Sequence, residues 1–401
     1  MGIHAYTLGV GVASRFGNEK ARLWVEGRKE FPEKGQDDDA WVWFHAASLG
    51  EFEQGRPLIE AIKERYPNIK VSLSFFSPSG YEVRKQYPLA DEVLYLPADT
   101  PKNARRWVER HRFVAAFFIK YEFWFHYMKA LADAQVPLFY ISLILNPDQY
   151  FFRGYGGWFR EQLRHVKHFF AQDEATKDLL NGIGFNNVTV CGDTRFDRVA
   201  AIARQAKKFL EIEAFIRGRK CVIAGSTWPP DERLLAEVLP QLPDDYCLIL
   251  APHDISEAHI QEIRKRFADH QLYTELDCSK YSRILIINTI GILSQLYQYA
   301  RFVYIGGGFG VNIHNIQEPV SFGCPVVFGP KHRSFKEAVD LVALGGAFSV
   351  NDSESLGKVF DRLIHDESHC AEASQICKRY VDSQLGATQT IMDQITSIFS
   401  A

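Results

Sequence analysis

Short runs of β-branched and aromatic residues alternate with amphipathic stretches along almost the whole chain, and this alternation constrains the fold more than any other feature. Several runs are apolar throughout, which is typical of parallel strands covered on both faces. Strands and helices that alternate at this spacing form βαβ units, so we expect an α/β chain with doubly wound parallel sheets. The runs predict strands at residues 41–46, 70–76, 92–96, 113–119, 138–142, 168–171, 188–191, 221–224, 246–251, 284–288, 302–305 and 325–328. The amphipathic stretches predict helices at residues 51–65, 122–134, 231–239, 255–267 and 334–344.

The strands fall into two series, separated by a charged helical stretch from Ala200 to Arg219. We therefore expect two Rossmann-like domains, residues 1–205 and 206–385, facing a cleft. A last helix within residues 386–401 can cross back to the first domain. Ligands of open α/β sheets bind beyond the carboxyl ends of the strands, so the loops that follow the strands are where we expect chemistry.

Composition excludes several classes of protein. The chain has 401 residues, of which 46% are hydrophobic and 24% charged, so it can bury sizeable cores. Its 46 basic and 49 acidic residues nearly balance, which predicts no nucleic-acid partner. The seven cysteines form no C-x-x-C pair, which disfavours a disulfide framework or a metal site and fits a reducing cytoplasm. The apolar run at residues 113–119 is far shorter than the roughly 20 residues of a membrane span.

The amino-terminal segment has two interpretations. Residues 6–14 are mildly apolar, and five basic residues and Trp24 follow between Arg15 and Lys29. An apolar face beside basic residues and a tryptophan suits a segment lying on an anionic membrane surface. It equally suits an amphipathic helix packed on the first domain, and the sequence leaves both open.

Two loops in the first half carry candidate catalytic residues. After the first strand, a turn of small residues places Glu51 in the first turn of a helix, where the helix dipole favours a carboxylate. We expect this carboxylate to be exposed at the sheet edge, where a general base meets a substrate hydroxyl, although it could merely cap the helix. Glu53 is a nearby alternative to Glu51 as the general base. After the fourth strand, Lys120 and Glu122 would cost desolvation unless they serve a ligand or each other.

The second half carries a pattern typical of a sugar-nucleotide site. Ser226 and Thr227 follow a strand and could cradle a phosphate with backbone and hydroxyl groups. The turn at residues 306–310 is not a G-x-G-x-x-G fingerprint, since residue 311 is Val, so a dinucleotide dehydrogenase is disfavoured. Glu318 lies on the next predicted helix, where its two oxygens can take both ribose hydroxyls while the helix amino terminus faces a phosphate.

The chain resembles the Kdo transferases, the 3-deoxy-D-manno-octulosonic acid transferases of lipopolysaccharide synthesis. The resemblance runs from about residue 20 to residue 345, and it includes an entry segment at residues 21–29. It rests on five motifs in the family's order: His45-Ala-Ala-Ser-Leu-Gly-Glu51, Glu122-Phe-Trp124, Gly192-Asp-Thr-Arg-Phe-Asp197, Asn288-Thr-Ile-Gly291 and His314-Asn-x-x-Glu318.

This resemblance implies a two-domain GT-B glycosyltransferase that moves Kdo from CMP-Kdo onto a lipid A precursor with inversion. It implies no metal and no cofactor besides the donor substrate, and a peripheral or monotopic place on the cytoplasmic face of the inner membrane. Glu51 would be the general base for the glucosamine 6-hydroxyl, and Arg195 sits where the family's transition-state lysine lies. The positions that match the family's nucleotide-binding residues are Pro252, His253, Ile290, Gly291, Ile292, Asn315, Ile316, Gln317 and Glu318.

The sequence departs from the family's pattern at three places. Lys120 replaces the first Glu of a Glu-x-Glu-x-Trp pattern, and His253 replaces the Arg of a Pro-Arg pair. The family's Asn-Ala-Arg-Leu-Ser segment is not recognisable near residues 142–150, and only Arg153 could stand in for its later Arg. The rival interpretations are another GT-B enzyme, such as a lipid-linked hexosyltransferase or a UDP-sugar epimerase, and a non-catalytic lipid- or nucleotide-binding scaffold.

Overall fold

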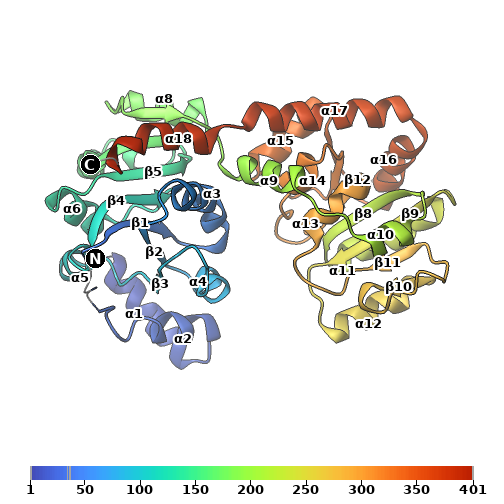
Figure 1. The fold of residues 1–401 in the computed structure, drawn as a ribbon, viewed down its shortest axis with the longest axis horizontal. Helices are drawn as coiled ribbons and strands as arrows, with labels where there is room; N and C mark the ends of the chain where they lie inside the picture. Colours follow the sequence, from blue (N-terminus) through green and yellow to red (C-terminus); the bar gives the residue numbers. More distant parts are fainter. Residues whose placement is uncertain (1, 34, 36–37, 400–401) are drawn as a thin grey trace. The chain divides into compact units, whose positions relative to one another are not determined.

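The structure, a computed structural model, describes residues 2–33, 35 and 38–399 and divides into two compact units (Figure 1). One unit comprises Met1–Asp197 together with Leu385–Ala401, and the other comprises Arg198–Gln384. The division falls within a helix, α9 (Arg195–Arg204), rather than near residue 205. The carboxyl-terminal segment belongs to the first unit.

The first unit is built on a seven-stranded sheet in the order β3-β2-β1-β4-β5-β6-β7, in which every pair of neighbours is parallel. Its strands are β1 (Ala40–Ala46), β2 (Lys70–Phe75), β3 (Glu92–Tyr95), β4 (Arg112–Ile119), β5 (Leu138–Leu143), β6 (Val166–Ala171) and β7 (Val188–Val190). Its helices are α1 (Gly2–Arg15), α2 (Glu19–Glu26), α3 (Leu49–Arg65), α4 (Pro78–Arg84), α5 (Pro101–Val108), α6 (Phe125–Asp133), α7 (Gly157–Leu163), α8 (Glu174–Gly182) and α18 (Ala387–Ile395), with short 3₁₀ turns η1 (Tyr150–Phe152) and η5 (Thr396–Ile398).

The second unit repeats this architecture with the strand order β10-β11-β9-β8-β12-β13-β14, again parallel throughout. Its strands are β8 (Lys220–Thr227), β9 (Tyr246–Pro252), β10 (His270–Leu272), β11 (Ile284–Ile286), β12 (Ala300–Ile305), β13 (Val326–Phe328) and β14 (Ala347–Ser349). Its helices are α10 (Leu210–Ile216), α11 (Pro229–Val238), α12 (Glu257–Arg266), α13 (Leu293–Leu296), α14 (Gln317–Ser321), α15 (Lys336–Leu344), α16 (Ser353–His365) and α17 (Glu367–Gln384), with 3₁₀ turns η2 (Leu239–Gln241), η3 (Tyr273–Glu275) and η4 (Tyr297–Tyr299).

All twelve predicted strands are present, and the α/β prediction is confirmed. Sequence analysis missed β10 and β14, because each is only three residues long and lies at the edge of its sheet, where side chains stay partly exposed. The helix expected at residues 122–134 begins only at Phe125, so Glu122 lies in a loop. Lys120 takes a left-handed conformation (φ 57°) that turns the chain before the helix starts. Five cysteines are buried: Cys221, Cys247, Cys324, Cys370 and Cys377.

The amino-terminal segment is packed more firmly than a purely surface-bound segment would be. Trp24 on α2 is only 4% exposed and meets Phe76 edge-on, so it is not an exposed interfacial anchor. The Arg28 guanidinium lies 4.0 Å from the Trp24 ring centroid and donates hydrogen bonds to the carbonyls of Leu96 and Phe76. For α2, the structure therefore shows the alternative of a helix packed on the first unit. Among the residues described, no helix is long and apolar enough to cross a membrane.

Helix α18 closes one face of the first sheet although it comes last in the sequence (Figure 1). Ile391, Met392 and Ile395 are buried in the same cluster as Leu58 and Ile62 of α3. The core of the first unit is therefore incomplete until the carboxyl-terminal helix docks.

Truncating Ile391 to Ala should lower the free energy of unfolding of the first unit by about 2–5 kcal/mol, since it removes a fully buried side chain from this cluster. Urea unfolding followed by tryptophan fluorescence measures the loss, because six of the seven tryptophans lie in this unit and only Trp228 lies in the other. The exposed Gln389→Ala on the same helix is the matched control. Equal effects of the two substitutions would contradict docking of α18 as a core element.

Candidate functional site

Each sheet has one point at which the strand order reverses, and several of the predicted site residues lie in the loops beside it. In the first sheet the reversal lies between β1 and β4, and in the second between β8 and β12. Loops at such a point diverge and leave a crevice for a ligand at the carboxyl edge. Lys120 after β4 and Ser226 near the end of β8 both have left-handed backbones (φ 57° and 53°). Strained non-glycine residues of this kind cluster at functional sites.

Glu51 stands in the first turn of α3, but it is buried rather than exposed as expected. Only 7% of the residue is exposed, and its Oε2 accepts a hydrogen bond from the Ala47 backbone N–H at 2.5 Å. Burial, and then the negative charge of Glu122, raise the pKa of Glu51 to about 8, while the Ala47 N–H and Lys120 oppose the rise. The helix dipole predicted an ionised Glu51, but desolvation outweighs the dipole at this position.

Glu122 is held beside Glu51 by a tryptophan–histidine pair. The Trp124 indole N–H lies between two acceptors, His45 Nε2 at 2.9 Å and Glu122 Oε2 at 3.0 Å. His45 is fully buried, and its Nδ1 lies 2.9 Å from the Ser74 hydroxyl oxygen. Because an indole only donates, His45 Nε2 must accept, and the imidazole proton sits on Nδ1 and is donated to Ser74. This chain of contacts fixes the orientation of the Glu122 carboxylate.

Glu53 and Arg195 are both engaged with charged partners. Glu53 pairs with Arg84 (2.6 Å) and Arg56 (3.7 Å), so the carboxylate that faces Glu51 is Glu122 and not Glu53. Arg195 starts α9, and its guanidinium lies 2.6 Å from Asp193 Oδ2 with its side chain 23% exposed. Burial alone raises the pKa of Asp193, but the Arg195 charge and hydrogen bonds outweigh burial and hold that pKa below its ordinary value.

In the second unit, the loop after β8 is tied down by two buried acids. Thr227 is fully buried and donates its hydroxyl to Glu232 Oε1 at 3.2 Å, so the structure does not bring this hydroxyl to the surface of the predicted phosphate cradle. Asp231 accepts hydrogen bonds from the backbone N–H groups of Trp228 (2.9 Å) and Gly307 (3.0 Å). The start of α11 and the glycine turn after β12 are thereby joined.

Close backbone packing explains the glycines of that turn. A Cβ on Gly306 would lie 2.3 Å from the Ser226 carbonyl oxygen, and Gly307 has a φ of +92° that favours glycine. The turn lets the chain return to His314, whose N–H donates to the Gly306 carbonyl at 3.1 Å.

Three rings meet at the carboxyl ends of β8, β9 and β12. The Trp228 indole N–H donates to His314 Nε2 at 2.9 Å, and the two rings are inclined by only 16°. The exposed His253, which follows Pro252 at the end of β9, stacks on both, with centroid distances of 4.6 Å to Trp228 and 4.5 Å to His314. Sequence analysis singled out His253 and missed Trp228, because an aromatic after a strand carries no signal until its neighbours are known.

The remaining predicted nucleotide residues lie at the same edge of the second sheet. Ile290 is 85% exposed in the loop after β11, followed by Gly291 with a φ of +97° and the partly buried Ile292. Asn315 Oδ1 accepts the Gln317 N–H at 3.0 Å where α14 begins, and Glu318 is half-buried in its first turn. Ile316 and Gln317 are buried. Because β11, β9, β8 and β12 are consecutive neighbours, these loops lie side by side.

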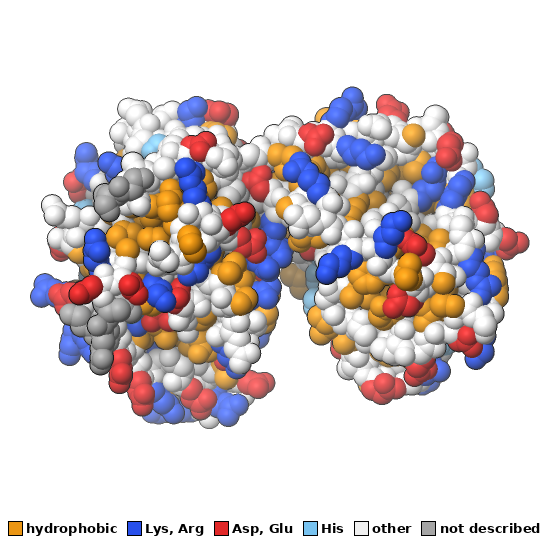
Figure 2. All heavy atoms as spheres, viewed as in Figure 1, with side chains coloured by type: hydrophobic (Ala, Val, Ile, Leu, Met, Phe, Trp, Pro, Cys, Tyr) orange, Lys and Arg blue, Asp and Glu red, His pale blue; other side chains and the backbone are white. Residues whose placement is uncertain are grey.

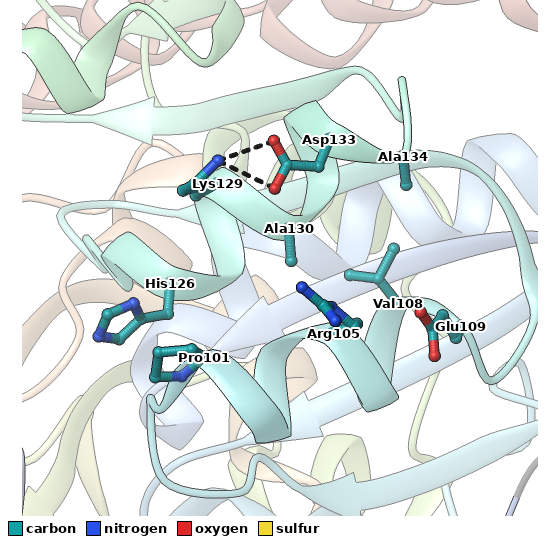
Figure 3. A pocket seen from close by; sticks show the side chains of 9 residues that line it. All are labelled: Pro101, Arg105, Val108, Glu109, His126, Lys129, Ala130, Asp133 and Ala134. Carbon is teal, nitrogen blue, oxygen red and sulfur yellow. Dashed lines mark hydrogen bonds and ion pairs between the residues drawn. The ribbon is translucent and has the colours of Figure 1, made fainter.

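A well-formed pocket lies apart from the predicted site residues, on the outer helices of the first unit (Figure 3). It measures about 290 Å³ between α5 and α6, and the ion pair of Lys129 with Asp133 borders it. On the face of each unit in Figure 2, acidic and basic side chains are interspersed, which agrees with the balanced composition.

Solved structures with this architecture define the class of fold. UDP-GlcNAc 2-epimerase from Neisseria meningitidis, bound to UDP-GlcNAc, superposes with a TM-score of 0.62 at 14% identity, covering 89% of this chain and 99% of that one. MurG from Acinetobacter baumannii superposes with a TM-score of 0.58 at 13% identity, covering 90% of this chain and 99% of the MurG chain. The chain therefore has the GT-B fold of two Rossmann-like units, a class of glycosyltransferases and sugar-nucleotide epimerases.

Sequence comparison finds similarity to one family within that class. Residues 12–198 match the family model described as 3-deoxy-D-manno-octulosonic-acid transferase (kdotransferase). The transferase of that name from Aquifex aeolicus is 25% identical over 332 residues, 80% of this chain and 86% of the relative. The transferase from Bordetella pertussis is 24% identical over 374 residues, which are 88% of this chain and 86% of the relative. By sequence, the chain is therefore similar to Kdo transferases over most of its length.

Replacing Glu51 by Gln should change stability in a pH-dependent way. Between about pH 4.5 and 8, the folded protein keeps a proton on Glu51 that the unfolded chain has lost, so this group makes wild-type stability fall as the pH rises. The glutamine side chain has no such proton, and the stability of the variant relative to wild type should increase over this range and level off above it. Each pKa unit corresponds to about 1.4 kcal/mol, so the gain is on the order of a few kcal/mol.

Urea unfolding from pH 5 to pH 9 measures the effect, with Glu53→Gln as the matched control because Glu53 sits in partly exposed ion pairs on the same helix. A Glu51→Gln difference that stays constant with pH would contradict the buried, proton-binding carboxyl group.

Proposed function

We propose that this chain transfers Kdo from CMP-Kdo to a lipid A precursor, with inversion at the anomeric carbon. The observation that carries the proposal is the pair of carboxyl groups, Glu51 and Glu122, held together at the carboxyl edge of the first sheet. A pKa of about 8 places Glu51 near the pH of the cell, where a general base combines strength with a useful ionised fraction. Similarity to the Kdo transferases supports the identity of the sugar.

In this proposal, Glu51 accepts the proton of the acceptor hydroxyl as that oxygen bonds to the anomeric carbon and the bond to CMP breaks. Lys120 favours the ionised form of Glu51, since its positive charge opposes the effect of Glu122. Lys120 thus has a use here although it replaces an acidic residue of the family's pattern. Arg195, held by Asp193, supplies positive charge toward the departing phosphate, so the proposal needs no metal ion.

The donor nucleotide is proposed to bind the second unit. Four loops at the carboxyl ends of β8, β9, β11 and β12 provide the site, and Glu318 in the first turn of α14 is placed to accept hydrogen bonds from the ribose. The backbone around Ser226 and Asn315 is proposed to face the phosphate.

Glu51→Gln should lower the rate of Kdo transfer by roughly 10²- to 10⁴-fold, the usual worth of general-base assistance, because the nearly isosteric amide cannot take the proton. Transfer from CMP-Kdo to a lipid A precursor is measured with purified protein, and CMP binding by calorimetry should be unchanged. Glu53→Gln is the control and should retain transfer. Near-normal transfer by Glu51→Gln would make Glu51 a structural residue, and binding of UDP in preference to CMP would favour a different GT-B enzyme.

We further propose that the protein works at the cytoplasmic face of the inner membrane, held peripherally through α1. The support is the apolar sequence of α1, the basic Arg15 at its end and the exposure of Val12 (51%) and Phe16 (86%). Apolar and aromatic side chains beside basic residues favour binding to anionic lipid.

Phe16→Glu should therefore release most of the protein from anionic vesicles in a flotation assay, since it places a charge where an aromatic ring would enter the interface. Leu344→Glu, at another exposed apolar position (55%) in the second unit, is the control and should float like wild type. Unchanged flotation of Phe16→Glu, or no binding of the wild-type protein to these vesicles, would contradict attachment through this segment.

A further inference from the structure

The ring cluster of Trp228, His253 and His314 contains two imidazoles in very different situations. His314 accepts the Trp228 indole N–H at Nε2, and an indole cannot accept a proton in return. A proton on His314 Nε2 would break this hydrogen bond and place two N–H groups against each other. Burial, and then the facing His253, also lower the pKa of His314 to about 4. His314 is therefore a neutral ring with its proton on Nδ1.

His253 has surroundings different from those of His314. It is exposed at the end of β9, and its ring nitrogens have no hydrogen-bond partner in the part of the chain that the structure describes. Its ring lies 4.6 Å from the Trp228 ring, inclined by 27°, and the face of an indole attracts a cation. The neutral His314, 4.5 Å away, offers no opposing charge. Of the two imidazoles, His253 is therefore the one whose ring nitrogens are left to meet a ligand.

The surrounding charges are compatible with this assignment. Asp254 follows His253 in the same loop, and the carboxylate of an adjacent residue favours a charged imidazole; His253 in turn is among the groups that lower the pKa of Asp254, after the hydrogen bonds from Ser256. Several charged or titratable groups on the packed elements are engaged with protein partners: Asp231 and Glu232 on α11, His259 on α12, Glu318 on α14 and Lys331 after β13. Helices α11 and α12 also carry Arg233, Glu237, Glu262 and Lys265.

We propose that His253 contacts an anionic group of the donor nucleotide only in its protonated form, with Trp228 and His314 as the platform that positions it, so that donor binding takes up a proton. The inference rests on the proposed donor site in the second unit. Trp228 is a positioning residue, since it acts by holding His314 neutral and by supporting the His253 ring. The affinity for the nucleotide should accordingly strengthen as the pH falls through the range in which imidazoles titrate, by at most about tenfold per pH unit.

Calorimetry of CMP methyl ester tests the proposal, because this phosphodiester keeps one negative charge, whereas the phosphate of CMP itself titrates near about pH 6. Titrations at pH 7 in buffers of different ionisation enthalpy give the number of protons taken up. Wild type should take up a fraction of one proton. His253→Arg should bind with similar affinity but take up none, because a guanidinium is permanently charged.

His253→Gln should bind about tenfold more weakly and also take up no proton. His365→Gln, at an exposed histidine paired with Asp361 on α16, is the matched control and should behave as wild type. Trp228→Phe keeps a ring under His253 but frees His314 Nε2, so its proton uptake should differ from that of wild type. Unchanged uptake in Trp228→Phe would overturn the positioning role.

Glu318→Ala separates this inference from the proposed function. The donor site stands if wild type binds the ester and Glu318→Ala weakens that binding. The role of His253 is then wrong if wild type takes up no proton, or if proton uptake persists in His253→Arg. If wild type does not bind the ester, or Glu318→Ala binds as well as wild type, the proposed donor site itself is wrong.

Discussion

The parallel strands of both sheets are covered on both faces, and the rest of this structure depends on that constraint. A strand such as β4 is almost entirely apolar from Phe113 to Ile119, because any polar side chain along it would lie in a core. Charged side chains can therefore appear only where the strand ends, and parallel strands all end at one edge. Lys120 and Glu122 follow β4 directly, beside the turn that carries Glu51 after β1. The site is a consequence of how the sheet is buried.

A tryptophan–histidine hydrogen bond orients candidate site residues in both units. In each, a tryptophan that follows a strand donates its indole N–H to Nε2 of a histidine at the point where the strand order reverses: Trp124 to His45, and Trp228 to His314. An indole has no acceptor, so in each pair the histidine Nε2 accepts the hydrogen bond. In the first unit this arrangement steadies Glu122 and so raises the pKa of Glu51. In the second unit it leaves His253 as the exposed ring of the cluster.

Glu51 illustrates how burial and local charge compete. The helix amino terminus and the Ala47 N–H both favour a carboxylate, yet the pKa rises to about 8 because the group is desolvated and faces Glu122. A helix dipole contributes at most about 2 kcal/mol, whereas desolvation of a buried carboxyl group can exceed this severalfold. A carboxyl group with this pKa is partly ionised near neutral pH, and the positive charge of Lys120 favours its ionised form.

The sequence by itself determined the strands, the parallel class and the loops in which to look, because apolar runs and small-residue turns are local properties that the chain carries before it folds. Its ordered motifs also indicated the family. It could not determine that Glu51 is buried, that Glu53 is drawn into ion pairs with Arg84 and Arg56, or that the Thr227 hydroxyl is directed to Glu232. Nor could it show that α18 completes the core of the first unit or that Trp228 meets His253 and His314. Those facts depend on which segments pack together, and desolvation, charge and ring stacking act only between groups that the tertiary structure has brought into contact.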